Sequence, residues 1–95
     1  MNSKPRVLIV DDHLIVREGL RLILEGEEDL LVVAEAADGA EALRQVAALA
    51  PDVVLMDLRM PGMDGLEALR HIGAEFPDVA VVVLTTFNED DLVLR

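Results

Sequence analysis

Acidic and hydroxyl side chains directly follow short apolar segments of this sequence. They are Asp11 and Asp12 after residues 6–10, Asp57 after 53–56, and Thr85 with Thr86 after 79–84. Carboxylates are ligands that hard divalent cations prefer. A carboxylate can also act as a nucleophile toward phosphorus, and hydroxyl groups can stabilise charge on a transferring phosphoryl group. The residue types therefore favour metal-assisted phosphoryl transfer to an aspartate, provided that the fold brings them together.

Apolar runs and helical periodicity alternate along the chain. The pattern predicts strands at residues 6–10, 30–36, 53–56 and 79–84, and helices within 11–27, 39–50, 66–76 and from Asn88 onward. Asp38 and Glu41 have the spacing of a capping box at the start of the second helix. Pro-Asp pairs at 51–52 and 77–78 end the second and third helices.

The predicted strands are continuous apolar runs, which is typical of parallel strands covered on both faces. Strict alternation with helices then predicts a doubly wound α/β sandwich of three layers. In such a sheet the residues after each strand meet at one edge, where ligands bind. If the strand order is 2-1-3-4, three carboxylates and two hydroxyls share a small cleft, and their like charges require a cation such as Mg²⁺.

Composition limits the classes of function. The chain has 95 residues, no cysteine and a formal net charge of -11, which argues against direct binding to nucleic acid. No apolar run reaches the ~18 residues of a membrane span, and no signal-peptide pattern precedes the first strand. We therefore expect one small domain in the cytoplasm.

Three motifs then stand in order on this β/α repeat: "DD" after the first strand, "DLRMPGMDG" after the third and "LTT" after the fourth. Over residues 6–95 the chain resembles the receiver domain of two-component response regulators, which has a flavodoxin-like fold. Its start, "VLIVDDHLIVREGLRLIL", resembles the NarL/FixJ branch, whose members carry a C-terminal helix-turn-helix domain of the LuxR type.

The resemblance implies roles for the acidic residues. Asp57 would be the phosphoacceptor, attacking a phosphohistidine of a sensor histidine kinase. Asp12 would bind Mg²⁺ directly, Asp11 would act near the metal, and Arg59 would contribute its backbone carbonyl as a further metal ligand.

The resemblance also implies roles for the residues that follow. Thr85 would be the switch hydroxyl that turns toward the phosphoryl group, and Thr86 would lie beside it in the site. Pro61 and Gly65 would shape the loop and the start of the third helix, consistent with their turn chemistry.

The implied protein is a signalling phosphoacceptor and not a classical enzyme, with at most self-catalysed phosphotransfer and dephosphorylation. Its implied partners are the kinase, a second copy upon phosphorylation, and DNA reached only through the helix-turn-helix domain. No membrane partner is implied.

Receiver domains continue with a fifth strand, which carries a lysine, and a fifth helix beside the first; this sequence stops at Arg95. We therefore expect residues 1–95 to be a receiver domain that is incomplete at its C-terminus, with the DNA-binding domain beyond it. The apolar arc of the first helix spans about 200°, where one buried face needs ~100°. With this arc uncovered and strand 79–84 at an open edge, the free polypeptide is expected to self-associate.

Other interpretations remain open at this stage. The aspartates could be helix caps or loop acids, and the threonines could be ordinary strand residues. His13 and His71 are expected to be solvated surface residues and not metal ligands.

Other functions also remain open. The chain could be a receiver-like dimerisation module without phosphorylation. It could also be an aspartyl-nucleophile phosphatase, although that class would place an aspartate at position 59, where this chain has Arg59. A nucleotide-binding fold is disfavoured, because no glycine-rich phosphate loop follows the first strand.

Overall fold

The structure is a computed structural model, and it describes residues 4–58 and 65–84. The elements alternate along the chain as β1 (Arg6–Val10), α1 (Leu14–Glu25), β2 (Leu31–Ala36), α2 (Gly39–Leu49), β3 (Val53–Asp57), α3 (Gly65–Glu75) and β4 (Ala80–Leu84). The helix predicted from Asn88 onward lies outside the described residues. None of the helices in the described part of the chain has the length and hydropathy that a membrane span requires.

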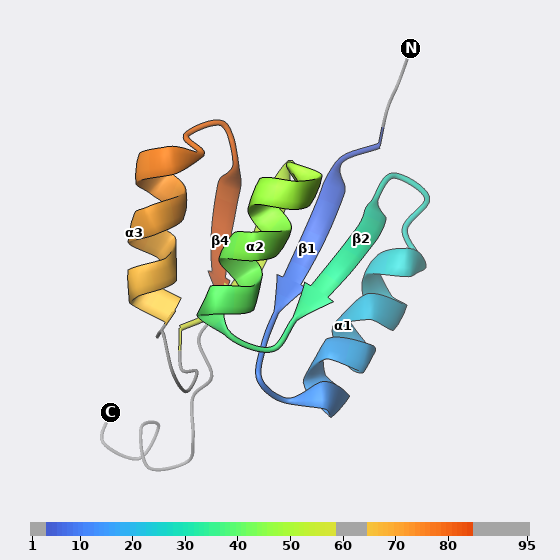
Figure 1. The fold of residues 1–95 in the computed structure, drawn as a ribbon. Helices are drawn as coiled ribbons and strands as arrows, with labels where there is room; N and C mark the ends of the chain where they lie inside the picture. Colours follow the sequence, from blue (N-terminus) through green and yellow to red (C-terminus); the bar gives the residue numbers. More distant parts are fainter. Residues whose placement is uncertain (1–3, 59–64, 85–95) are drawn as a thin grey trace, which may run out of the picture.

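The four strands form one parallel sheet in the order β2-β1-β3-β4, which confirms the predicted fold and order. Val10 of β1 pairs with Met56 of β3, so the next residues, Asp11 and Asp57, reach the same edge. Asp57 itself still belongs to the sheet, where it pairs with Leu84 of β4. The carboxyl ends of the strands lie together at the lower edge of the molecule in Figure 1.

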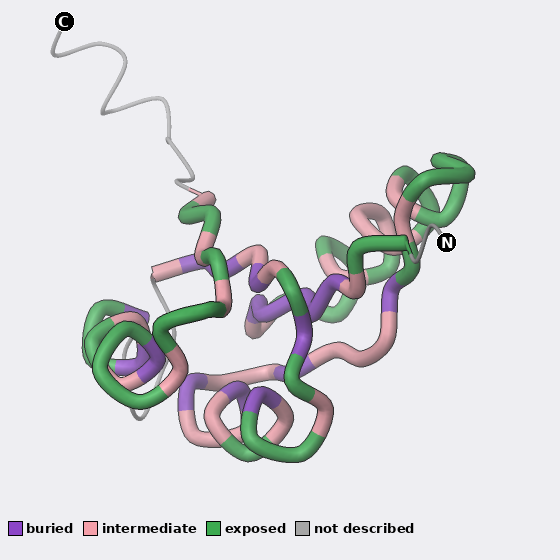
Figure 2. Tube along the Cα trace, turned by 90° about the horizontal axis from the view of Figure 1, so that it is seen from above, coloured by how far each residue is buried: buried purple, intermediate pink, exposed green. Residues whose placement is uncertain are grey.

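Two hydrophobic cores separate the three layers. The larger core joins the sheet to α2 and α3 through residues that include Leu8, Val54, Met56, Val46 and Ile72, all fully buried. The smaller core lies on the opposite face, where Leu20 and Leu24 of α1 pack against Val7, Ile9 and Val32. Figure 2 shows buried residues along the strands and on the inward sides of two helices.

Helix α1 is the loosely packed layer. None of its residues is buried, and Ile15, Leu22 and Ile23 are 82%, 74% and 69% exposed. Val82 of β4 is also 47% exposed. The prediction that this helix carries more apolar surface than one neighbour covers is therefore confirmed.

The element boundaries differ from the predicted ones by a few residues. Helix α1 begins at Leu14, because His13 is extended (φ -101°, ψ 115°) and Asp11 and Asp12 belong to the preceding loop. Helix α2 ends at Leu49, because Ala50 adopts a left-handed conformation (φ 47°) before Pro51. Strand β3 is one residue longer than predicted, since it includes Asp57.

The predicted capping box at α2 forms with a small variation. Asp38 Oδ1 accepts a hydrogen bond from the backbone N–H of Glu41 (2.7 Å). Glu41 Oε1 accepts from the N–H of Ala37 (2.8 Å), one residue before the cap. These contacts satisfy donors that a helix N-terminus otherwise leaves unpaired.

Candidate functional site

The acidic residues predicted to share one edge of the sheet do meet there. Asp11 and Asp57 are each 2% exposed. Asp11, Asp12, His13 and Asp57 each offer one ligand atom, and these atoms all lie within 4.8 Å of one another. We call these four residues the acidic cluster. The parallel sheet produces it, because β1 and β3 end side by side.

Asp57 is held by the end of β3 and by the start of α3. The backbone N–H of Gly65 donates to the carbonyl of Leu58 (3.1 Å). A Cβ at position 65 would overlap Leu58 Cα and lie 2.8 Å from the carbonyl oxygen of Asp57. Glycine therefore allows α3 to begin directly against the residues that position Asp57, as expected for Gly65. Pro61 lies outside the described residues.

The β1–α1 loop is ordered by hydrogen bonds of Asp11. Its N–H donates to the carbonyl of Ala36 at the end of β2 (3.1 Å). Its Oδ1 accepts from the N–H of His13 (2.8 Å), a local turn that aspartate favours. The first contact ties the backbone of Asp11 to β2, and the second orients its buried carboxylate toward the start of α1.

Asp12 carries the atom that best indicates a cation. Its Oδ1 is buried and accepts no hydrogen bond from any residue that the structure describes. His13 Nδ1 lies 3.0 Å from it, which makes an ion pair only when the ring is protonated. Buried carboxylate oxygens seldom remain unsatisfied, and two further carboxylates stand beside this one. The donor set of oxygen atoms fits a hard divalent cation such as Mg²⁺.

His13 is exposed, as predicted, but its ring turns toward the carboxylates. The side chain is 67% exposed, and Nδ1 lies 3.1 Å from Asp11 Oδ1. The hydrogen bond with Asp11 raises the pKa of His13, and the negative charge of Asp12 raises it further. The sequence signal for this contact is the position of the histidine directly after two aspartates.

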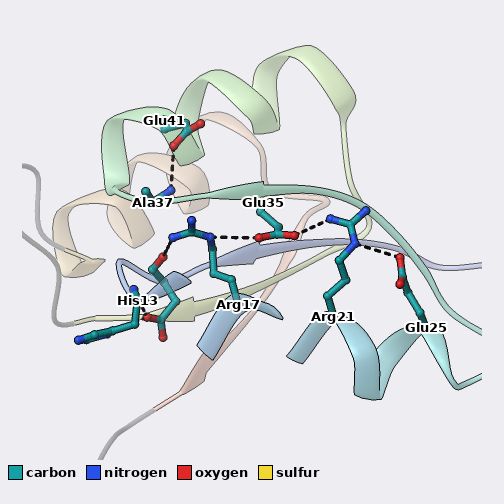
Figure 3. Close-up of polar contacts among 8 residues, drawn as sticks. His13, Arg17, Arg21, Glu25, Glu35, Ala37 and Glu41 are labelled. Carbon is teal, nitrogen blue, oxygen red and sulfur yellow. Dashed lines mark hydrogen bonds and ion pairs between the residues drawn. The ribbon is translucent and has the colours of Figure 1, made fainter. Parts of the chain in front are cut away.

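Beside the acidic cluster lies an ion-pair network that was not predicted from the sequence. Arg17 Nη1 donates to the backbone carbonyl of Asp11 (2.6 Å), and Arg17 Nε donates to Glu35 Oε1 on β2 (3.1 Å). Arg21 Nη1 donates to the other oxygen of Glu35 (2.5 Å), and Arg21 Nε donates to Glu25 Oε2 (3.0 Å). Figure 3 shows the two guanidinium groups on either side of Glu35.

The charges of this network stabilise the ionised form of Glu35. The hydrogen bond from Arg21, followed by that from Arg17, lowers the pKa of Glu35. The two arginines stand four residues apart on α1, which places them on one face of the helix. That spacing is the signal in the sequence, although it does not reveal that the partner is on β2.

Several predicted site residues lie outside the described part of the chain: Arg59, Thr85 and Thr86. Their proposed roles therefore stay predictions. His71 is described, and its side chain is 43% exposed beside Glu75 (3.4 Å), as expected for a surface residue.

The sequence profile of the response regulator receiver domain matches residues 7–95. The chain is 51% identical over 88 residues to the transcriptional regulatory protein LiaR of Bacillus subtilis, covering 93% of this chain and 42% of that protein. It is 45% identical over 91 residues to the oxygen regulatory protein NreC of Staphylococcus aureus, covering 95% of this chain and 42% of that protein.

Solved structures of response regulators are also similar to this chain. The signal receiver domain of the putative response regulator NarL from Mycobacterium tuberculosis superposes with a TM-score of 0.85 at 38% identity, covering 97% of this chain and 74% of that one. RcsB of Salmonella typhimurium, a response regulator, superposes with a TM-score of 0.83 at 37% identity, covering 93% of this chain and 45% of that one. The chain thus spans less than half the length of the curated relatives described above.

Proposed function

Since this chain belongs to the response regulator receiver domain family, we propose that it is a phosphoacceptor that receives a phosphoryl group on Asp57 from a sensor histidine kinase. One observation carries the proposal: buried Asp57 stands with Asp11 and Asp12 in a cluster whose ligand atoms lie within 4.8 Å of one another. The turn hydrogen bond of Asp11 gives one of these carboxylates a role in the loop, whereas the gathering of all three at one edge of the sheet supports the proposal.

In the proposed reaction, an oxygen of the Asp57 carboxylate forms a bond to phosphorus. The phosphorus–nitrogen bond of the phosphohistidine breaks, and its electron pair stays on the imidazole nitrogen. Pairing within the sheet positions the backbone of Asp57, and Gly65 allows the start of α3 to lie against that backbone.

Asp11 and Asp12 would hold Mg²⁺, with the backbone carbonyl of Arg59 as a further ligand. When bound, the ion would neutralise charge on the phosphoryl oxygens. Thr85 would donate its hydroxyl to the phosphorylated Asp57 as the switch residue, and Thr86 would lie beside it. The unsatisfied oxygen of Asp12 supports the metal assignment.

Receiver domains are signalling phosphoacceptors and not classical enzymes. Any catalysis by this chain would be limited to its own phosphorylation and dephosphorylation. The alternatives of a dimerisation module without phosphorylation and of an aspartyl phosphatase are not favoured by the family match.

Residues 1–95 would form the receiver part of a longer transcription regulator in the cytoplasm. The names of LiaR and NreC describe regulatory proteins, and one RcsB structure contains dimers bound to DNA. The net charge of -11 supports an arrangement in which another domain contacts DNA. We further propose that phosphorylation promotes a homodimer; the RcsB dimers on DNA support the dimeric state.

The proposal is tested on the full-length gene product that contains these residues. The protein is incubated with Mg²⁺ and acetyl phosphate, and its intact mass is measured beside the Asp57→Asn variant. We expect a labile phosphoryl adduct on the wild-type protein that is missing from the variant and from samples with a chelator. An unmodified wild-type protein would refute the proposal.

A further inference from the structure

We propose that Arg17 is a positioning residue for the β1–α1 loop, which carries Asp11 and Asp12. Its side chain links this loop to β2, and we call this link the latch. The latch consists of Arg17, Glu35 and the backbone carbonyl of Asp11. The inference rests on the proposed function, because it assumes that Asp11 and Asp12 hold a divalent cation. It adds a residue that contacts neither the cation nor the phosphoryl group.

One guanidinium group joins two separate parts of the fold. Arg17 Nη1 donates to the carbonyl of Asp11 (2.6 Å), and Nε donates to Glu35 Oε1 (3.1 Å). The Arg17 side chain is only 15% exposed, and that of Glu35 is 21% exposed. Hydrogen bonds between charged groups are stronger when solvent competes little for them, and the planar guanidinium holds two acceptors at a fixed angle.

The loop depends on this latch because other restraints at the start of α1 are weak. The residue at the N-cap, His13, makes no capping hydrogen bond with its side chain. The first apolar residues of the helix, Leu14 and Ile15, are 57% and 82% exposed. Apolar packing and capping therefore contribute little to fixing the helix start, and the contacts of Arg17 and Asp11 hold it.

The carbonyl of Asp11 is part of the peptide that joins the two metal-binding aspartates. Holding this peptide fixes the direction in which the carboxylates of Asp11 and Asp12 leave the backbone. The two carboxylates and Asp57 repel one another when no cation is bound, so an untethered loop would let them separate. Arg17 thus preorganises the cluster for the cation.

Arg21 provides a matched control on the same helix. It contacts Glu35 (2.5 Å) and Glu25 (3.0 Å), and no contact described for it reaches the loop. Arg17→Ala and Arg21→Ala both remove a cation from the network and an ion pair with β2. Only the Arg17 substitution releases the carbonyl of Asp11.

The test measures Mn²⁺ affinity of the full-length gene product, with Mn²⁺ as a probe of the same oxygen ligands. Free Mn²⁺ is quantified by electron paramagnetic resonance, at a temperature where thermal unfolding shows that every variant is folded. We expect Arg17→Ala to raise the dissociation constant about tenfold, the scale reported for loss of an outer partner of a metal ligand. Arg21→Ala should leave it within about twofold of wild type, well below that outer-partner effect.

A second readout separates positioning from general stability. The Arg17→Ala protein should recover the wild-type rate of phosphorylation by acetyl phosphate when Mg²⁺ is saturating, while requiring more Mg²⁺ to reach half of that rate. If Arg17→Ala does not fold, Arg17→Lys replaces it. Lysine keeps the charge but lacks the planar fork, so weaker Mn²⁺ binding is expected there too.

The outcomes distinguish this inference from the function it rests on. Unchanged Mn²⁺ affinity in the folded Arg17 variant, or equal losses in the Arg17 and Arg21 variants, would overturn the latch and leave the phosphoacceptor proposal intact. A wild-type protein that binds no Mn²⁺ and takes up no phosphoryl group would overturn both.

Discussion

Among single residues, the site combines two buried carboxylates, Asp11 and Asp57, with the carboxylate of Asp12. The buried Oδ1 of Asp12 accepts no hydrogen bond within residues 4–58 and 65–84 and lies 3.0 Å from His13 Nδ1. Such an arrangement is unfavourable without a cation, because the charges repel one another and lose contact with water. The acidic cluster is therefore expected to lower the stability of the fold when no cation is bound.

This conflict gives a prediction for Asp12→Asn. Without divalent metal, the substitution should increase the free energy of unfolding by about 1 kcal/mol, the order of one like-charge contact at ~4 Å in a water-like dielectric. With saturating Mg²⁺ the wild-type protein should be more stable than Asp12→Asn, because it gains binding energy that the variant loses. Urea unfolding with and without Mg²⁺ measures both signs.

The control for this experiment is Asp78→Asn, a substitution of an acid in the turn after α3. Asp78 is exposed and is not a member of the acidic cluster. It should show neither the metal-free gain nor the loss of Mg²⁺ stabilisation. An Asp12→Asn protein that is destabilised without metal would contradict the described electrostatics.

Among the helices, α3 contains two glycines that differ in the space around them. A Cβ at Gly65 would overlap Leu58, whereas a Cβ at Gly73 would meet nothing within 4 Å. Gly65→Ala should therefore lower the free energy of unfolding by about 1–3 kcal/mol, as overpacked sites do. Since Gly65 abuts the backbone of Asp57, the rate of phosphorylation should fall as well.

Gly73→Ala is the matched substitution within the same helix. It should raise the free energy of unfolding by about 0.5–1 kcal/mol, because alanine favours the helix interior over glycine. Chemical unfolding of both variants measures the contrast. If both substitutions change the free energy of unfolding in the same direction, the close approach of α3 to β3 is contradicted.

The contact between α1 and β2 gives a prediction about pH. The neighbouring arginines lower the pKa of Glu35 below its ordinary value of 4.5. The resulting stabilisation is fully present above the unfolded pKa, and it is lost as pH falls through the folded pKa. Glu35→Gln should therefore lower the free energy of unfolding by about 1 kcal/mol at pH 7, the size expected for loss of a partly exposed ion pair. The loss should become progressively smaller below about pH 4.

Urea unfolding of wild type and Glu35→Gln across this pH range measures the difference. Glu27→Gln is a suitable control, because Glu27 is exposed and is not among the partners of Arg17 or Arg21. A difference between wild type and Glu35→Gln that stays constant down to pH 2 would contradict the role of these ion pairs.

At the scale of the whole molecule, apolar surface remains on the α1 side of the sheet. Ile15, Leu22 and Ile23 of α1 are exposed, as is Val82 of β4. The 95-residue polypeptide is therefore expected to self-associate in a concentration-dependent way. Sedimentation velocity over a range of concentrations tests this, and Ile23→Lys should weaken the association. A monodisperse monomer with cooperative unfolding would contradict the expectation.

The sequence predicted the fold well because its signals are local and agree with one another. Apolar runs such as residues 53–56 indicated parallel strands, and Asp38 with Glu41 indicated the start of α2. The meeting of Asp11, Asp12 and Asp57 followed from the topology alone. The exact start of α1 did not, since it depends on the extended conformation of His13.

The latch could not be predicted from the sequence for a different reason. Arg17 and Glu35 are 18 residues apart, and their contact depends on how α1 packs across β2. The acceptor of the second hydrogen bond of Arg17 is a backbone carbonyl, which every residue possesses. No residue type therefore marks Asp11 as the partner.

The phosphoacceptor role of Asp57 can be tested at the residue itself. The most direct measurement treats the full-length protein with acetyl phosphate and Mg²⁺, reduces the acyl phosphate with borohydride, and locates the reduced residue by peptide mass spectrometry. We predict reduction at Asp57 that depends on Mg²⁺ and on Asp12. Reduction at Asp11 or Asp12 instead, or at no residue of the chain, would contradict this role.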